Sequence, residues 1–189
     1  MGREFEIKYV ATPEKLAQIQ QLWDHWTEFS METTYFDTAD DQLSGKKCTL
    51  RHRLENGQSV CTLKTPTGGL GRGEWDVQAA WSAPVVAQLF DEAQQAPIVF
   101  EELIPVCGAR FTRLAKTVEL PGCTAEIALD SGVLLGGGRE IPLCELEIEV
   151  KSGSEAMAVN WAVHFAQRFA LQQESKSKFK RALQLAKGE

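Results

Sequence analysis

The sequence predicts an α+β domain built on an antiparallel sheet. Eight segments alternate apolar and polar residues with period two, and three or four other segments carry helix start signals or helical apolar spacing. Short turn signals such as Glu55-Asn56-Gly57 and Pro121-Gly122 separate the strands, which favours antiparallel pairing over helical crossovers. A chain of 189 residues can bury one core, so we expect a single domain.

Helices are expected at four places. Thr12 can cap a helix over about residues 13–27, because Pro13 suits the first helical position and apolar residues follow at helical spacing. Ser82, ahead of Pro84, starts a short helix that reaches about Asp91. A third helix begins near Ser154, with an apolar stripe of Met157, Trp161, Phe165 and Phe169, and a basic helix covers Ser177 to Lys187.

Strands are expected where apolar and polar residues alternate, over residues 3–10, 32–38, 48–55, 59–65, 72–80, 111–119, 124–130 and 143–151. Two glycine-rich stretches, residues 68–73 and 136–138, lie between strands. Both lack the Lys-Ser/Thr pair that completes a phosphate-binding loop, so we expect hairpin loops there.

Composition argues against several classes of protein. No apolar run approaches 18 residues and the N-terminus leads with charges, so we expect a cytoplasmic protein with no membrane partner. The formal net charge of −6 argues against nucleic acid as a partner. Five cysteines without a C-x-x-C pair indicate reduced thiols rather than disulfides or a zinc site.

At least five of the expected strands place charged residues on one face. On the last of them, Glu145, Glu147 and Glu149 alternate with apolar residues and have no cation nearby before Lys151. These carboxylates repel each other, and a bound cation would relieve the repulsion. The charged faces are either the solvent side of a sheet or the lumen of a closed barrel that holds a metal and a polyanion, and the pattern alone favours neither.

The residues that carry these charges resemble a known family. The resemblance covers nearly the whole chain and lies in an ordered set of motifs: Glu4-x-Glu6-x-Lys8, Tyr35-Phe36-Asp37-Thr38, Leu50-Arg51-His52-Arg53, Thr62-Leu63-Lys64, Arg72-Gly73-Glu74, Arg113, Glu126-Ile127-Ala128-Leu129-Asp130, Cys144-Glu145-Leu146-Glu147-Ile148-Glu149 and Ser177-Lys178-Phe179-Lys180-Arg181. This set looks like that of the CYTH superfamily, also called triphosphate tunnel metalloenzymes. It is most similar to the bacterial inorganic triphosphatases, whose N-terminal module often precedes a helical CHAD domain. We expect residues 1–189 to be one CYTH domain without a CHAD domain.

The resemblance implies a fold and a set of roles. The implied fold is a closed eight-stranded antiparallel β-barrel, the triphosphate tunnel, with flanking helices and a C-terminal helix. The implied cofactor is Mg²⁺ or Mn²⁺, which suits carboxylate oxygens without His or Cys, and its expected ligands are Glu4, Glu6, Glu145, Glu147 and Asp130. Substrate phosphates would bind Lys8, Arg51, Arg53, Lys64, Arg72, Arg113, Lys178 and Arg181. Glu74 and Lys178 are expected to act in catalysis.

The implied reaction is metal-dependent hydrolysis of inorganic triphosphate to diphosphate and phosphate. Relatives with the same fold act as class IV-type adenylate cyclases, thiamine triphosphatases or nucleoside triphosphatases, and the motifs do not distinguish these substrates. A non-catalytic module that binds polyphosphate is a further alternative. The expected partner in each case is a small-molecule or polymeric phosphate compound.

Overall fold

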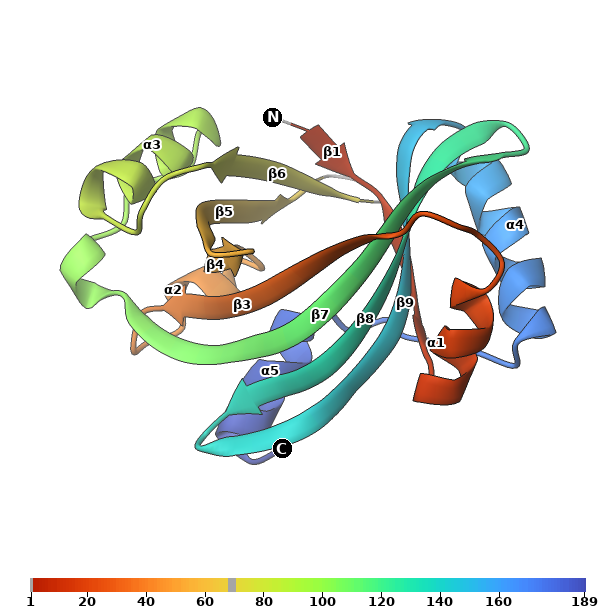
Figure 1. Cartoon of the computed structure of the whole chain (residues 1–189). Coiled ribbons are helices and arrows are strands. Elements are labelled where there is room, and N and C mark those ends of the chain that lie inside the picture. The colour runs from red at the N-terminus through yellow and green to blue at the C-terminus, as the bar shows by residue number, and fades with distance from the viewer. Residues whose placement is uncertain (1, 68–70) are drawn as a thin grey trace.

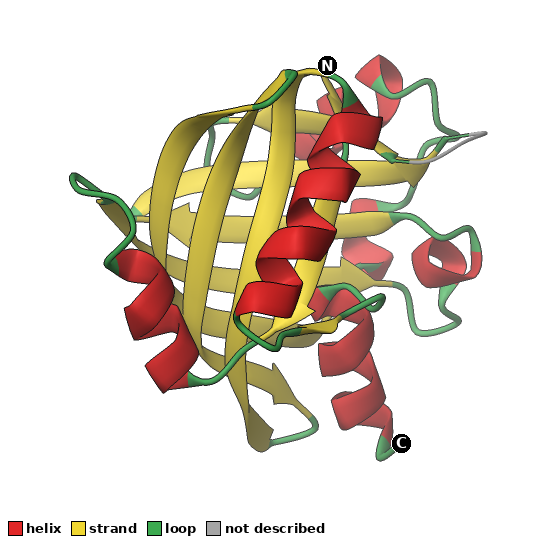
Figure 2. Cartoon of the chain, turned by 90° about the vertical axis from the view of Figure 1, so that its right-hand side faces the viewer, coloured by secondary structure: helices red, strands yellow, loops and turns green. Residues whose placement is uncertain are grey.

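The computed structural model describes residues 2–67 and 71–189, and within them one curved antiparallel sheet carries helices on its outer side and at one end (Figures 1 and 2). The strands are β1 (Gly2–Glu4), β2 (Glu6–Val10), β3 (Thr27–Asp37), β4 (Thr49–Glu55), β5 (Gln58–Pro66), β6 (Arg72–Val77), β7 (Ile104–Leu120), β8 (Cys123–Gly136), β9 (Arg139–Gly153) and β10 (Gln172–Gln173). The helices are α1 (Pro13–Gln20), α2 (Gln42–Gly45), α3 (Ala83–Glu92), α4 (Glu155–Arg168) and α5 (Lys178–Lys187), with a 3₁₀ turn at Phe100–Glu102.

The sheet is not the closed eight-stranded barrel that the resemblance implies. Its ten strands follow the order β1-β6-β5-β4-β3-β7-β8-β9-β2-β10, and within the described residues no ladder joins the edge strand β1 to the edge strand β10. The reason lies at Phe5, where the first ten residues divide into two short strands. β1 pairs with β6, whereas β2 pairs with β9, so the N-terminal segment reaches both sides of the sheet without forming one continuous closing ladder.

Three apolar clusters hold the helices to the sheet. α1 and α4 cover the outer face of β2, β8 and β9, where Ile19 and Phe165 pack against Ile127 and Ile148. α3 covers β4–β6 through Leu89, which packs among Leu50, Leu63 and Trp75. In the described chain no helix is long and apolar enough to cross a membrane.

The helix α5 lies against the inner side of the sheet at one end. Its Ala182 belongs to a cluster with Met31, Phe111, Leu134 and Leu143 from β3, β7, β8 and β9. Gly136 permits this approach, because a Cβ atom built there would lie only 2.4 Å from the Ala182 carbonyl oxygen. The position of α5 brings its first turn, at Lys178, to the charged face of the sheet.

The helix expected over residues 13–27 ends much earlier, at Gln20. The indole Nε1 of Trp26 donates to the carbonyl oxygens of Gln20 and Trp23, at 3.0 and 2.9 Å, and His25 adopts a positive φ of 59°. These contacts form a compact turn, and β3 begins directly after it. The helical spacing of the tryptophans therefore reflects packing against α4, where the Trp23 and Phe165 rings stack at 6.0 Å, rather than a longer helix.

The other expected helices and strands occur near their expected positions, although several strands are longer and the one expected over 72–80 ends at Val77; α2, β10 and the 3₁₀ turn were not expected. β7, β8 and β9 extend to 17, 14 and 15 residues because the strands continue past the alternating segments into stretches covered by α5. Within the stretch 136–138, Gly137 and Gly138 form the hairpin turn between β8 and β9, as expected, both at positive φ. The other glycine-rich loop lies in part outside the described residues, at 68–70.

Candidate functional site

The inner face of the curved sheet encloses a cavity of about 780 Å³. Side chains that alternate along β2, β4, β5, β6 and β9 point into it, and the first turn of α5 borders it. The cavity therefore collects charges from segments far apart in the sequence. The expected site residues that line it are Glu4, Glu6, Lys8, Arg51, Arg53, Lys64, Arg72, Glu74, Arg113, Glu147 and Lys178.

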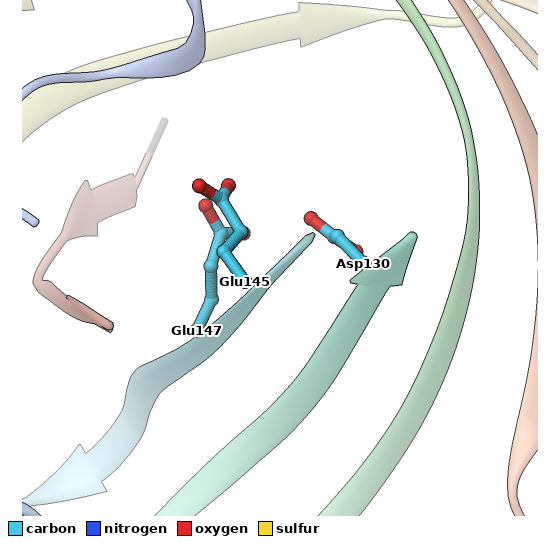
Figure 3. Close-up of side chains that lie close together, drawn as sticks. All are labelled: Asp130, Glu145 and Glu147. Atoms are coloured by element: carbon cyan, nitrogen blue, oxygen red, sulfur yellow. The ribbon is translucent and has the colours of Figure 1, made fainter. Parts of the chain in front are cut away.

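Three expected site residues, Asp130, Glu145 and Arg181, do not line the cavity. Asp130 and Glu145 have no exposed surface, because Lys178 and Arg181 of α5 cover them, and they lie next to Glu147, which does line the cavity. Asp130, Glu145 and Glu147, named here the acidic trio, project toward one another from β8 and β9 (Figure 3). One carboxylate oxygen from each lies within 4.8 Å of the others, a spacing that could hold a metal ion.

Three cations neutralise the acidic trio. Arg113 on β7 donates from Nε and Nη2 to the two oxygens of its register partner Asp130, at 2.8 and 2.7 Å, and also contacts Glu147. The Lys178 ammonium contacts all three carboxylates, and Arg181 pairs with Glu145. Three negative and three positive side chains thus form one buried cluster.

The pKa values in this cluster shift in opposite directions. Burial would raise the pKa of Glu147, but the charges of Lys178 and Arg113 outweigh it and hold that pKa well below its usual value. Burial raises the pKa of Glu145, and its pairing with Lys178 offsets the rise only in part. Burial would lower the pKa of Lys178, yet the surrounding carboxylates raise it above the ordinary lysine value.

A second group of carboxylates lines the cavity itself. Glu6 on β2 stands directly opposite Glu149 on β9, and like charges at such positions repel. Each carboxylate of this group has its own lysine: Lys8 lies 2.7 Å from Glu6 Oε1 and Lys151 lies 2.8 Å from Glu149 Oε2. Glu4 receives two hydrogen bonds from Lys64, at 2.5 and 2.6 Å. The carboxylates and the lysines alternate around the cavity wall.

Two cavity arginines are short of carboxylate partners. Arg53 is buried and bonds Thr33 Oγ1 at 2.9 Å, and its single carboxylate contact is a 3.4 Å approach to Glu55. Burial, together with the charge of nearby Arg51, lowers the pKa of Arg53 to about 10. Arg72 donates to the Thr49 hydroxyl and to backbone carbonyl oxygens. The positive charge of these two guanidinium groups is therefore not fully neutralised by protein carboxylates. It remains available to bind an anion.

The cavity also contains residues that the site prediction did not include. Glu149 and Lys151 continue the alternation of β9 beyond Glu147, so the period-two pattern could have identified both. Tyr35 comes from β3, and its ring packs against Phe179 of α5 at 5.2 Å. Lys180, which follows Phe179, is exposed and borders the cavity mouth.

The donor atoms in both acidic groups suit a hard divalent cation. In both groups the candidate ligand atoms are carboxylate oxygens. These carboxylates repel one another unless cations lie between them. No histidine or cysteine is among the cavity-lining residues. Mg²⁺ and Mn²⁺ prefer such oxygen ligands. The residues present therefore fit a magnesium-type site.

The chain is similar in sequence to a bacterial inorganic triphosphatase. Over 165 residues the chain is 29% identical to an inorganic triphosphatase of Haemophilus influenzae, a match that covers 82% of this chain and 47% of that protein. The chain thus spans about half the length of this relative.

Solved structures share the fold. The PH1819 protein of Pyrococcus horikoshii OT3 superposes with a TM-score of 0.65 at 21% identity, covering 97% of this chain and 99% of the other. HpAC1 of Hippeastrum, described as an adenylyl cyclase homologue with a dominant triphosphatase activity, gives a TM-score of 0.65 at 16% identity, covering 100% and 97% of the two chains. The CYTH domain model matches residues 2–183, which include every strand that borders the cavity, and the chain therefore belongs to the CYTH domain family.

Proposed function

We propose that this chain hydrolyses inorganic triphosphate to diphosphate and phosphate with the help of Mg²⁺ or Mn²⁺. The observation that carries the proposal is the pairing of acids with bases around one cavity. Arg53 and Arg72 keep hydrogen-bonding capacity for phosphate oxygens, while Glu4, Glu6 and Glu149 gather carboxylate oxygens on neighbouring strands. If the cavity only bound polyanions, so many carboxylates would lower its affinity for them by electrostatic repulsion.

The carboxylates divide into two sets in this proposal. Glu4, Glu6 and Glu149 line the open cavity, and the acidic trio of Asp130, Glu145 and Glu147 lies under the first turn of α5 at the cavity border. A divalent cation held by these residues would neutralise charge on the phosphate oxygens and lower the pKa of a bound water. Glu147 belongs to the trio and also lines the cavity, so it connects the two sets.

The bases bind and orient the substrate. Lys8, Arg51, Arg53, Lys64, Arg72, Arg113 and Lys178 border the cavity, where their charge-assisted hydrogen bonds would hold three phosphate groups in a fixed geometry. Arg181 stands behind them and pairs with Glu145, so we assign it to positioning α5. To Glu74, which contacts Arg51 and Lys64 at 3.3 Å, we assign the role of orienting the attacking water.

The cavity lining favours unsubstituted triphosphate over nucleotides. Its aromatic residues are Tyr35 and Phe179, which are buried and packed against each other, so neither presents a free ring face for a purine. The Haemophilus influenzae relative is named an inorganic triphosphatase, which also supports inorganic triphosphate as the substrate. The volume of about 780 Å³ nevertheless falls within the range of pockets for larger ligands, which keeps adenylate cyclase and nucleoside or thiamine triphosphatase as second candidates.

A substrate panel tests the proposal. Phosphate release would be measured from inorganic triphosphate, ATP and thiamine triphosphate, and cyclic AMP from ATP, each with Mg²⁺, Mn²⁺ or EDTA. We expect metal-dependent phosphate release with inorganic triphosphate preferred. Full activity in EDTA would overturn the metal role, cyclic AMP as main product would identify a cyclase, and binding without turnover of any compound would indicate a polyphosphate-binding module.

A further inference from the structure

The ammonium group of Lys178 fills the centre of the acidic trio. Its Nζ atom lies 2.7 Å from Asp130 Oδ2 and 2.7 Å from Glu147 Oε1, and it also contacts Glu145 Oε1. An ammonium group has three hydrogens, and three carboxylates surround this one. The side chain is only 6% exposed.

This position is the one that a divalent cation would take in the trio. The ligand oxygens lie within 4.8 Å of one another, and Lys178 already contacts all three carboxylates. With Arg113 and Arg181 paired to the same carboxylates, the cluster is neutral. A divalent cation added beside a seated Lys178 would leave two excess positive charges in a buried place, which is strongly unfavourable.

The first turn of α5 is anchored to the sheet in part by this contact, together with the Arg181–Glu145 pair and the packing of Phe179 on Tyr35. The Arg181 amide donates to the Ser177 carbonyl at 3.1 Å, and the Lys180 amide donates to Ser177 Oγ at 3.1 Å. Farther along α5, Ala182 packs in the apolar cluster against β7 and β8, and this contact involves no charged group. Removing Lys178 from the trio would take away the most buried ionic anchor of the first turn and so make its amides open more often, while the rest of α5 stays docked.

We propose that Lys178 and a divalent cation are alternative occupants of the acidic trio. In the metal-free protein the ammonium takes the cation position, and metal binding at the trio releases Lys178 into the cavity that it already borders. There a bound phosphate chain becomes its new partner. This last step rests on the proposed function, whereas the exchange between Lys178 and metal does not.

Hydrogen exchange of the α5 amides in the full chain tests the exchange without any substrate. Titration with MgCl₂ or MnCl₂ should speed exchange of the Lys180 and Arg181 amides, while the amides after Ala182 change little. Adding inorganic triphosphate to the metal-loaded protein should restore their protection. Unchanged exchange of the first turn at saturating metal would overturn the proposal.

Calorimetric titration with Mn²⁺ gives a second readout through Lys178→Met, with Lys180→Met as the matched control on the same helix. Lys178→Met removes the competing ammonium, so the variant should bind one Mn²⁺ at least about tenfold more tightly than wild type. Lys180→Met should change the affinity much less, because Lys180 is exposed and contacts none of the three trio carboxylates in the described chain. Equal Mn²⁺ affinity in both variants would contradict the competition.

The two variants also separate this proposal from the proposed function. Should Lys178→Met fail to fold, the hydrogen-exchange titration of the wild type decides the matter alone. Metal-driven loosening of α5 in a protein that hydrolyses no triphosphate would support the exchange and reject the function. Triphosphate hydrolysis with a first turn that metal leaves unchanged would do the reverse.

Discussion

Glu6 and Glu149 are register partners across the β2–β9 ladder, so two carboxylates of the same charge stand directly opposite each other in the cavity wall. Burial raises the pKa of Glu149, and the nearby Glu4 and Glu126 charges contribute to the rise. Lys8 and Lys151 relieve the repulsion in part, each from its own strand. A divalent cation between the two strands would neutralise the repulsion that remains.

The first prediction concerns this pair. Glu6→Gln and Glu149→Gln should each lower kcat/KM for triphosphate at least about a hundredfold and raise the metal concentration needed for half-maximal rate, because a lost ligand removes charge stabilisation. Steady-state kinetics over a Mg²⁺ series would measure both effects. Glu102→Gln, at an exposed position in the 3₁₀ turn, is the control and should match wild type. Variants of the pair that keep wild-type metal dependence would place the metal elsewhere.

The second prediction concerns ligand binding and stability. Metal and triphosphate together should raise the melting temperature by about 5–10 °C at a hundred times the Kd, since they bind the folded state and neutralise its cavity charges. A thermal scan would compare the protein alone, with Mg²⁺, with triphosphate, and with both. A shift that is equal for triphosphate and for sulfate at the same ionic strength would reduce the effect to nonspecific anion binding.

The third prediction concerns Arg53, whose guanidinium is buried and weakly paired. Arg53→Gln should raise KM for triphosphate by about tenfold to a hundredfold, because a charge-assisted phosphate contact contributes about 1.5–3 kcal/mol. Arg110→Gln is the matched control, since Arg110 is exposed and pairs with Glu140 at 3.2 Å. If both substitutions produce the same small change that fades with added salt, Arg53 acts only through long-range attraction.

The fourth prediction concerns the alkaline limb of stability. The folded protein holds the pKa of Lys178 above the ordinary value of 10.5, so above that pH the unfolded chain loses a proton that the folded chain keeps. The stabilisation from Lys178 is therefore complete below pH 10.5 and is lost as the pH rises toward the folded value. Urea unfolding at a series of pH values should show a steeper decline for wild type than for Lys178→Met. Parallel curves would show that Lys178 is not coupled to the trio.

The fifth prediction concerns the packing of α5 against the sheet. A methyl group at Gly136 would collide with the Ala182 carbonyl, so Gly136→Ala should cost about 1–3 kcal/mol of unfolding free energy and lower kcat by displacing Lys178. Gly45→Ala is the control, because nothing lies within 4 Å of a Cβ atom built there. Unfolding curves and kinetics on both variants would measure the difference, and equal stability of the two would show that α5 does not depend on this close approach.

Local alternation in the sequence was sufficient to identify most strands and the charged faces. The side chains of a strand point to opposite faces in turn, so the spacing of Glu145 and Glu147, or of Arg51 and Arg53, places each pair on one face whatever the rest of the chain does. The same reasoning could have extended the site to Glu149. Helical spacing gave a wrong helix end at Trp23 and Trp26, which lie in a turn where Trp23 stacks on Phe165 of α4 and Trp26 donates to the Trp23 carbonyl oxygen.

Tertiary structure decided which charges pair with one another and which of them α5 covers. The sequence and its family resemblance placed Asp130, Glu145 and Glu147 together with Glu4 and Glu6 as one set of metal ligands. In the structure the first three form a separate neutral cluster with Arg113, Lys178 and Arg181. The pairing partners of these three carboxylates come from β7 or from α5, far along the chain. Local sequence determines on which face a side chain lies, but the opposing charge that neutralises it is chosen by strand register and helix docking, which depend on the whole fold.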